Sequence, residues 1–136
     1  MLSNDQGPRL CVEAVIKTDR GVVMVKRASE SYAGFWHLPG GAVKYGEMLV
    51  EAVKRVVRAE TGMEVEAERV LGYVEYPDEV QVRGFGWSVG IVFGAKITAG
   101  ELTGRVPEEE VGEFEKLPEQ LITEQRDFLI RKEILT

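Results

Sequence analysis

Three charged residues and two glycines in the middle of the chain have the types and spacing to bind a metal ion and phosphate. Gly41 is followed after five residues by Glu47 and after seven more by Arg55, and Glu60 and Gly62 come soon afterwards. Carboxylates bind hard divalent ions such as Mg²⁺, which screen the charge of a diphosphate and orient a water for attack. This segment is therefore the first candidate for chemistry on a phosphate ester.

A helix and a glycine turn must position these side chains. Apolar residues recur at i, i+3, i+4 and i+7 between Glu47 and Glu60, which predicts an amphipathic helix that ends at Gly62 as its C-cap. In front of the helix, Pro39-Gly40-Gly41 predicts a turn with unusual backbone angles. Short strands are predicted on either side of that turn, at Phe35 to Leu38 and at Ala42 to Lys44.

The rest of the chain predicts strands and a second helix. Alternating Val- and Ile-rich runs, polar loops and helical spacing indicate strands at 9–18, 22–27, 65–76 and 85–97, loops at 19–21, 28–34 and 77–79, and a helix at 118–135. The order of strands, helix, strands and helix favours an α/β (α+β) fold with a mixed sheet.

The composition is that of one globular domain covering residues 1–136, with 44% hydrophobic and 29% charged residues. Apolar runs such as Val22 to Val25 are far shorter than the ~20 residues that cross a bilayer, and Met1 to Arg9 has no signal-peptide core, so we expect a cytoplasmic protein without membrane contact. The net charge of −6 argues against a nucleic-acid partner but is compatible with metal-mediated phosphate binding. The single cysteine, Cys11, is predicted to be a small buried residue of the first strand.

The segment from Gly41 to Met63 resembles the Nudix box, G-x5-E-x7-R-E-U-x-E-E-x-G-U, in which U is aliphatic. The preceding run Phe35-Trp36-His37-Leu38-Pro39-Gly40-Gly41 resembles the entry strand of the same family, and Gly46-Glu47 resembles its usual Gly-Glu pair. The resemblance implies an α/β/α sandwich, a hydrolase that depends on Mg²⁺ or Mn²⁺, a small nucleoside diphosphate linked to another group as substrate, and a possible homodimer.

Two box positions that are acidic in the family are Val56 and Ala59 in this chain. Of the three glutamates concerned only Glu60 remains, which argues against the multi-metal cluster of a typical member. The same replacements, and the spacing of Lys26-Arg27 from the glycine turn, are similar to the GDP-mannose mannosyl hydrolase subgroup, in which water attacks the sugar carbon. The late-loop histidine of that subgroup is missing, because the single histidine here is His37.

The resemblance assigns roles to individual residues. The predicted catalytic residues are Glu47, Arg55, Glu60 and Glu110. The predicted metal donors are the carbonyl of Gly40 together with Glu60 and Glu110, the last from the run Glu108-Glu109-Glu110. Arg27, Gly40 and Gly41 are predicted to bind the substrate, with the Arg27 guanidinium on the diphosphate.

Structural interpretations stand beside these assignments. The alternative interpretation of Glu47 and Arg55 is a solvated helix pair, that of Arg27 is an exposed residue at a strand end, and that of residues 108–110 is a solvated loop. His37 is interpreted as a buried structural histidine. Trp36, Phe85 and Trp87 are interpreted as core residues.

Two functions from different classes follow. The first is a Mg²⁺-dependent hydrolase of a nucleoside diphosphate derivative, with a GDP-mannose-like nucleotide sugar favoured. The second is a catalytically impaired Nudix fold that binds a nucleotide as a sensor or interaction module, because the two box glutamates and the late histidine are missing.

Overall fold

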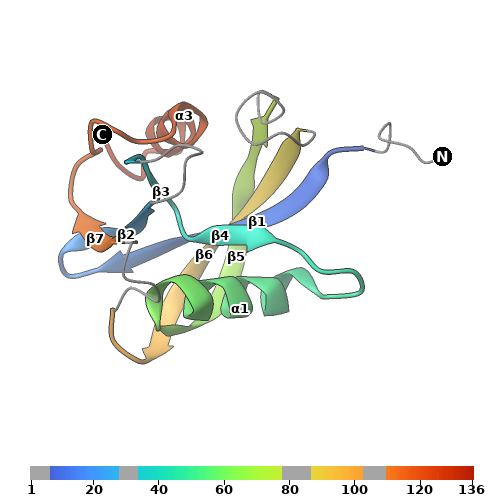
Figure 1. The fold of residues 1–136 in the computed structure, drawn as a ribbon. Coiled ribbons are helices and arrows are strands. Elements are labelled where there is room, and N and C mark those ends of the chain that lie inside the picture. Colours follow the sequence, from blue (N-terminus) through green and yellow to red (C-terminus); the bar gives the residue numbers. More distant parts are fainter. Residues whose placement is uncertain (1–6, 28–33, 78–86, 103–109) are drawn as a thin grey trace.

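The computed structural model describes residues 7–27, 34–77, 87–102 and 110–136. Strands and helices follow one another along the chain as strands β1 Arg9–Thr18, β2 Gly21–Lys26, β3 Trp36–His37 and β4 Gly40–Ala42, helix α1 Leu49–Thr61, strands β5 Glu64–Tyr76, β6 Ser88–Ala99 and β7 Glu110–Phe114, and helix α3 Thr123–Arg131 (Figure 1).

The strands form one mixed sheet in which β1 is central. The order is β3-β2-β1-β6-β5, while β4 also pairs with β1 and β7 with β2. Strand β1 runs parallel to β6 and antiparallel to β4, and the β1–β4 register places Gly40 opposite Glu13. The unusual backbone angles predicted at Pro39-Gly40-Gly41 were wrong, because only Pro39 forms a bend, while Gly40 and Gly41 are strand residues without a positive φ. The segment Pro39 to Gly41, called the glycine turn below, is therefore anchored on the middle strand of the sheet.

Helices α1 and α3 lie on opposite sides of the sheet, with α1 below and α3 above it in Figure 1. Alternate residues of β1 serve the two faces: Val12 and Ala14 belong to the core cluster under α1, whereas Val15 belongs to the cluster under α3. This alternation follows from the period of two in a strand, and covering both faces explains why β1 is apolar along much of its length. The predicted α/β/α sandwich with a mixed sheet is confirmed.

Several predicted boundaries were wrong. The strand expected at 42–44 lies at Gly40–Ala42, because these are the residues that pair with β1, and Val43 adds one further hydrogen bond from its N–H to the carbonyl of Leu10. Helix α1 begins at Leu49 rather than Glu47, and α3 occupies only Thr123–Arg131 of the predicted 118–135. Strand β3 keeps two of the four residues expected at 35–38. Strand β7 was not predicted, because its sequence is short and polar and its pairing partner β2 is distant in the chain.

The side chains expected in the core divide into three groups. Trp36 is half-buried and packs edge-on against Phe114, with ring centroids 4.7 Å apart. The core assignment of Trp87 was wrong, since it is 41% exposed directly before β6, and Phe85 lies outside the described residues. Cys11 is partly rather than fully buried, because it stands near the outer end of β1.

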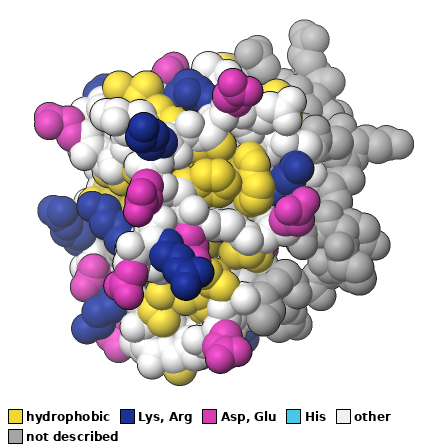
Figure 2. Space-filling model, turned by 90° about the vertical axis from the view of Figure 1, so that its left-hand side faces the viewer, with side chains coloured by type: hydrophobic (Ala, Val, Ile, Leu, Met, Phe, Trp, Pro, Cys, Tyr) yellow, Lys and Arg dark blue, Asp and Glu magenta, His cyan; other side chains and the backbone are white. Residues whose placement is uncertain are grey.

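The charged side chains on one face of the molecule are mixed in sign. On the face drawn in Figure 2, basic side chains alternate with acidic ones around a central group of hydrophobic side chains. Such mixing does not form the continuous basic stripe that tracks a nucleic-acid backbone. Within the described residues, no helix is long and apolar enough to cross a membrane.

Candidate active site

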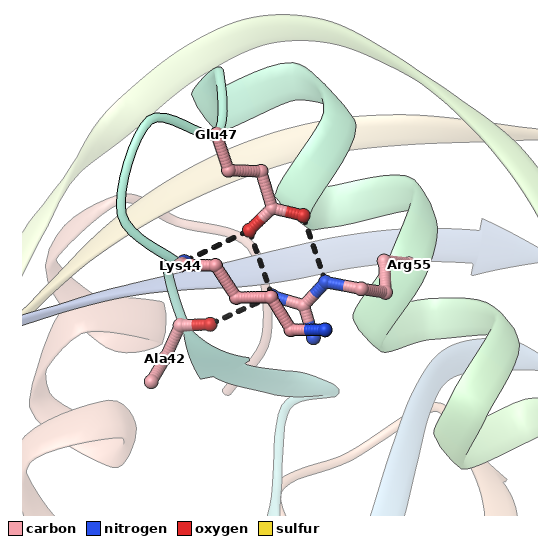
Figure 3. A network of polar contacts seen from close by, with 4 residues as sticks. All are labelled: Ala42, Lys44, Glu47 and Arg55. Atoms are coloured by element: carbon pink, nitrogen blue, oxygen red, sulfur yellow. Dashed lines mark hydrogen bonds and ion pairs between the residues drawn. The ribbon is translucent and has the colours of Figure 1, made fainter.

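Arg55 ties the loop between β4 and α1 to the helix (Figure 3). Its Nε donates to Glu47 Oε2 at 2.7 Å and its Nη2 donates to Glu47 Oε1 at 2.8 Å, so the two side chains form a bidentate pair. The same Nη2 donates to the carbonyl of Ala42 at 2.8 Å, and Glu47 Oε1 accepts the backbone N–H of Lys44 at 2.9 Å. The pair therefore connects both ends of the loop, which a solvated helix pair would not do.

Glu60 contacts the glycine turn directly. Its Oε1 accepts the backbone N–H of Gly40 at 2.9 Å, so two of the three predicted metal donors are neighbours. Only glycine fits at this position, because a Cβ on Gly40 would lie 2.6 Å from the carbonyl oxygen of Val12. The turn can approach the retained glutamate closely for this reason.

The positions of the two missing glutamates differ in their surroundings. Val56 is 5% exposed and belongs to the core under α1, where a Cβ on Gly41 would lie 3.0 Å from its Cγ1. Ala59 is exposed on the helix surface. Val56 therefore fills the space beneath the turn with methyl groups where the family places a carboxylate.

Glu110, the third predicted metal donor, is the first residue of β7. It lies opposite Lys26 in the β2–β7 ladder, with its Oε1 3.7 Å from the Lys26 ammonium, and its side chain is 67% exposed. The run to which it belongs was interpreted as a solvated loop, but Glu110 is in a strand, while Glu108 and Glu109 lie outside the described residues.

The oxygen donors near the glycine turn fit a Mg²⁺ site that is shared with substrate phosphates. In the described part of the chain, no group of three or more His, Cys, Asp or Glu side chains could hold an ion by itself. Mg²⁺ usually retains several waters and is bound by one or two carboxylates together with substrate phosphates. The carboxylate of Glu60 and the carbonyl of Gly40 suit such a shared site, in which the ion would screen phosphate charge.

A small cleft lies next to the turn on the α3 side of the sheet. It brings together the three predicted substrate-binding residues Arg27, Gly40 and Gly41, and its volume is about 60 Å³. His37 also lines it, is 5% exposed and places its Nδ1 2.7 Å from the carbonyl oxygen of Leu38. Its burial agrees with the structural role expected of it.

The cleft also contains a polar network that the sequence analysis missed. The backbone N–H of Leu38 donates to Gln125 Oε1 at 2.7 Å, Gln125 Nε2 donates to the Tyr76 hydroxyl at 3.0 Å, and that hydroxyl donates to Glu13 Oε2. Burial, followed by the negative charge of Glu13, raises the pKa of Tyr76 well above its ordinary value of 10.0, so the phenol keeps its proton. One signal was present in the sequence, an acid inside the apolar run Val12 to Ile16.

The Glu47–Arg55 pair predicts a pH effect on stability. The hydrogen bonds from Arg55, followed by the one from the backbone N–H of Lys44, lower the pKa of Glu47 from 4.5 to about 2. Because the folded-state value is depressed, the ionised carboxylate contributes stability fully above pH 4.5 and loses that contribution as the pH falls towards 2. We expect Glu47→Gln to lower the melting temperature at about pH 6 and to have much less effect at about pH 3.

Arg55→Met provides the control for this prediction. In an Arg55→Met background the carboxylate has lost the largest cause of its lowered pKa and keeps the hydrogen bond from the backbone N–H of Lys44, so the effect of adding Glu47→Gln on the melting temperature should differ much less between the two pH values. Thermal denaturation followed by circular dichroism gives the melting temperatures of the wild type, the two single variants and the double variant. A Glu47→Gln effect that grows as the pH falls would contradict the prediction.

Comparison with known proteins identifies the family. The family model described as NUDIX domain matches residues 7–135. The chain is 35% identical over 95 residues to an ADP-ribose pyrophosphatase of Methanocaldococcus jannaschii, covering 70% of this chain and 54% of that protein. It is 37% identical over 81 residues to the 8-oxo-dGDP phosphatase NUDT18 of Homo sapiens, covering 60% of this chain and 23% of that protein.

A solved structure matches this chain over nearly its whole length. The crystal structure of a MutT NUDIX hydrolase from Burkholderia pseudomallei matches with a TM-score of 0.79 at 29% identity, covering 96% of this chain and 100% of that one. By contrast, the chain spans about half or less of the length of the two curated relatives. The family match extends over nearly all of the sequence, and the chain belongs to the Nudix family.

Proposed function

We propose that this protein is a Mg²⁺-dependent hydrolase of a nucleoside diphosphate linked to a second group, with a GDP-mannose-like nucleotide sugar favoured. The observation that carries the proposal is the hydrogen bond between Glu60 and the backbone of Gly40. It holds the retained box carboxylate against the residue whose carbonyl would be the other donor. Arg27, in the adjoining cleft, supplies a cation for the diphosphate.

The relatives support the general substrate class. By their names, one acts on ADP-ribose and another on 8-oxo-dGDP, and both compounds contain a nucleoside diphosphate. The preference for a nucleotide sugar comes instead from Val56 and Ala59, which match the replacements of the mannosyl hydrolase subgroup. Val56 is buried in the core, and Glu60 is the carboxylate that the box places beside the glycine turn. This arrangement favours one metal ion shared with the substrate over a cluster of several metal ions.

The products distinguish attack on carbon from attack on phosphorus. GDP-mannose, ADP-ribose and 8-oxo-dGDP are incubated with the protein and Mg²⁺ in isotopically labelled water, and the products are analysed by mass spectrometry. We expect GDP-mannose to yield labelled mannose and unlabelled GDP, because a single shared ion suits stabilisation of a leaving diphosphate. Label in a nucleoside monophosphate or a sugar phosphate would show attack on phosphorus. Absence of turnover on all three compounds would contradict the hydrolase proposal.

A binding module is the second candidate, and the burial of Val56 is the observation that favours it. A box with methyl groups beneath the turn has lost part of the charge that holds metal in the family. For a module of this kind, nucleotide affinity would be the same in Mg²⁺ and in a chelator. For the hydrolase, binding of the diphosphate would tighten when Mg²⁺ is added, because ion and phosphate share ligands.

A further inference from the structure

A groove on the α3 side of the sheet is lined by charged side chains that take no part in the cleft beside the glycine turn. Its volume is about 620 Å³, within the range of about 300–1,000 Å³ that is usual for small-molecule sites. Four basic and two acidic side chains line it: Lys17, Arg69, Lys96, Lys132, Glu68 and Glu133. Four cations against two anions give the groove a positive balance on a chain whose net charge is −6.

The sheet brings two of these cations next to each other. Strands β1 and β6 run parallel with Ile16 beside Ala95, so Lys17 and Lys96 follow as neighbours, and both are exposed. Like charges on neighbouring strands repel each other. Glu66 lies opposite Lys96 on β5, but in the part of the chain that the structure describes the ion pairs are all formed by other residues. The two lysines are therefore available to an anion from solution.

An irregularity in β5 turns a third cation towards the same groove. Ala67 packs against the core cluster under α1, and the period of two in a strand would place Arg69 on that side as well. The β5–β6 ladder instead shifts its register between Ala67 and Arg69, which places Arg69 opposite Gly94. Bulges of this kind re-aim side chains at sheet edges and beside binding sites. Arg69 thereby joins the lysines around one groove.

Gly94 leaves the floor of the groove open. A Cβ on Gly94 would have the Leu71 side chain as its nearest neighbour, at an ordinary contact distance of 3.8 Å, and its φ is not positive. Neither crowding nor backbone conformation therefore requires glycine here. Glycine inside a strand weakens the strand and often marks a place where a ligand approaches closely. The apolar side chains of Val15, Leu71 and Ile134 surround this opening.

We propose that this groove is a second ligand site that binds a nucleotide, with its phosphate groups on the cations and its base over Gly94. Phosphate suits the groove because it carries more than one negative charge and several acceptor oxygens, and because guanidinium and ammonium groups bind it well. The apolar floor suits the uncharged face of a base. Lys17 lies four residues beyond Glu13 on β1, which separates the groove from the cleft by roughly 13 Å at about 3.3 Å per residue.

Amide NMR spectra of isotope-labelled protein distinguish the two sites. GDP, guanosine and pyrophosphate are titrated in turn, with a chelator present so that binding does not depend on Mg²⁺. We expect GDP and pyrophosphate to shift the amide signals of Gly94 and Lys96 and guanosine to leave them in place. Raising the salt from about 0.05 M to about 0.5 M should weaken this binding, because exposed charges are screened. Shifts at Gly40 and Gly41 report the cleft separately.

Lys17→Gln/Lys96→Gln should weaken GDP binding at Gly94 by about tenfold, since each exposed charge contact is worth about two- to fivefold in affinity. Lys54→Gln/Lys116→Gln is the matched control, because it removes the same two charges at exposed positions outside the groove and should bind GDP as wild type does. Gly94→Ala adds a Cβ that the fold accommodates but that occupies the floor, so it should also weaken binding. Read at Lys96, it carries the test if the groove variant does not fold.

Three results would overturn the inference. GDP shifts at Gly40 and Gly41 without any at Gly94 would confine the nucleotide to the cleft. Equal groove binding by the two double variants would remove the lysines from the site. Groove shifts with a peptide of glutamates but not with GDP would assign the groove to an acidic protein segment instead. Turnover enters none of these measurements, so the second site and the proposed hydrolase can fail separately.

Discussion

Glu60→Gln is expected to lower kcat/KM by about 100-fold or more and to raise the Mg²⁺ concentration needed for half-maximal activity. The amide keeps the shape of the side chain and can still accept the N–H of Gly40, which the carboxylate now accepts at 2.9 Å. It loses the negative charge that a hard divalent ion requires. Initial rates at varied Mg²⁺ concentration, measured on a compound that wild-type protein turns over, give both quantities.

Glu51→Gln is the control for this prediction. Glu51 lies in the first turn of α1 and is exposed, so the same change there leaves the glycine turn untouched. Its kcat/KM should stay within about twofold of wild type, since surface changes away from special features have small effects. Equal rates for Glu60→Gln and Glu51→Gln, with both proteins folded, would remove Glu60 from the reaction. The retained spacing of Gly41, Glu47, Arg55 and Glu60 would then need another explanation.

Local patterns predicted the elements that hold the box. The bounds of β1 at Arg9–Thr18 were correct, because a Val- and Ile-rich run followed by an Asp-Arg-Gly turn is a local signal. Helix α1 was predicted from its apolar spacing, and Gly62 is its left-handed C-cap, with φ of 79° and its N–H bonded to the carbonyl of Arg58. Family spacing assigned Glu47 and Arg55 to the site, and the structure pairs these two side chains although they are eight residues apart.

Contacts between distant segments could not be predicted in this way. Glu13 and Tyr76 are 63 residues apart and Tyr76 and Gln125 are 49 apart, so only the folded sheet and α3 bring them together. Because both faces of β1 are covered, its buried residues form a continuous run in which the acid has no alternating pattern to mark it. Strand β7 was missed for a related reason, since its pairing with β2 is set by the fold rather than by its own composition.

Phe128→Ala is expected to be the most destabilising of the changes considered, with a loss of about 3–5 kcal/mol in the free energy of unfolding. Phe128 is 1% exposed and belongs to the core cluster under α3. It fits closely against the sheet, because a Cβ on Gly72 of β5 would lie 2.9 Å from its Cε1. For a domain of this size the melting temperature should fall by about 10–20 °C.

Ile130→Ala separates packing from helix propensity. Ile130 lies on the same helix and is 47% exposed, so its truncation removes few buried contacts and should cost about 1 kcal/mol or less. Urea unfolding of the three proteins, followed by circular dichroism, measures the difference. If Phe128→Ala were no worse than Ile130→Ala, α3 would not be fixed on the sheet by this ring. The position of Gln125, three residues earlier on the helix, would then lose its support, and with it the orientation of Tyr76 and Glu13 in the cleft.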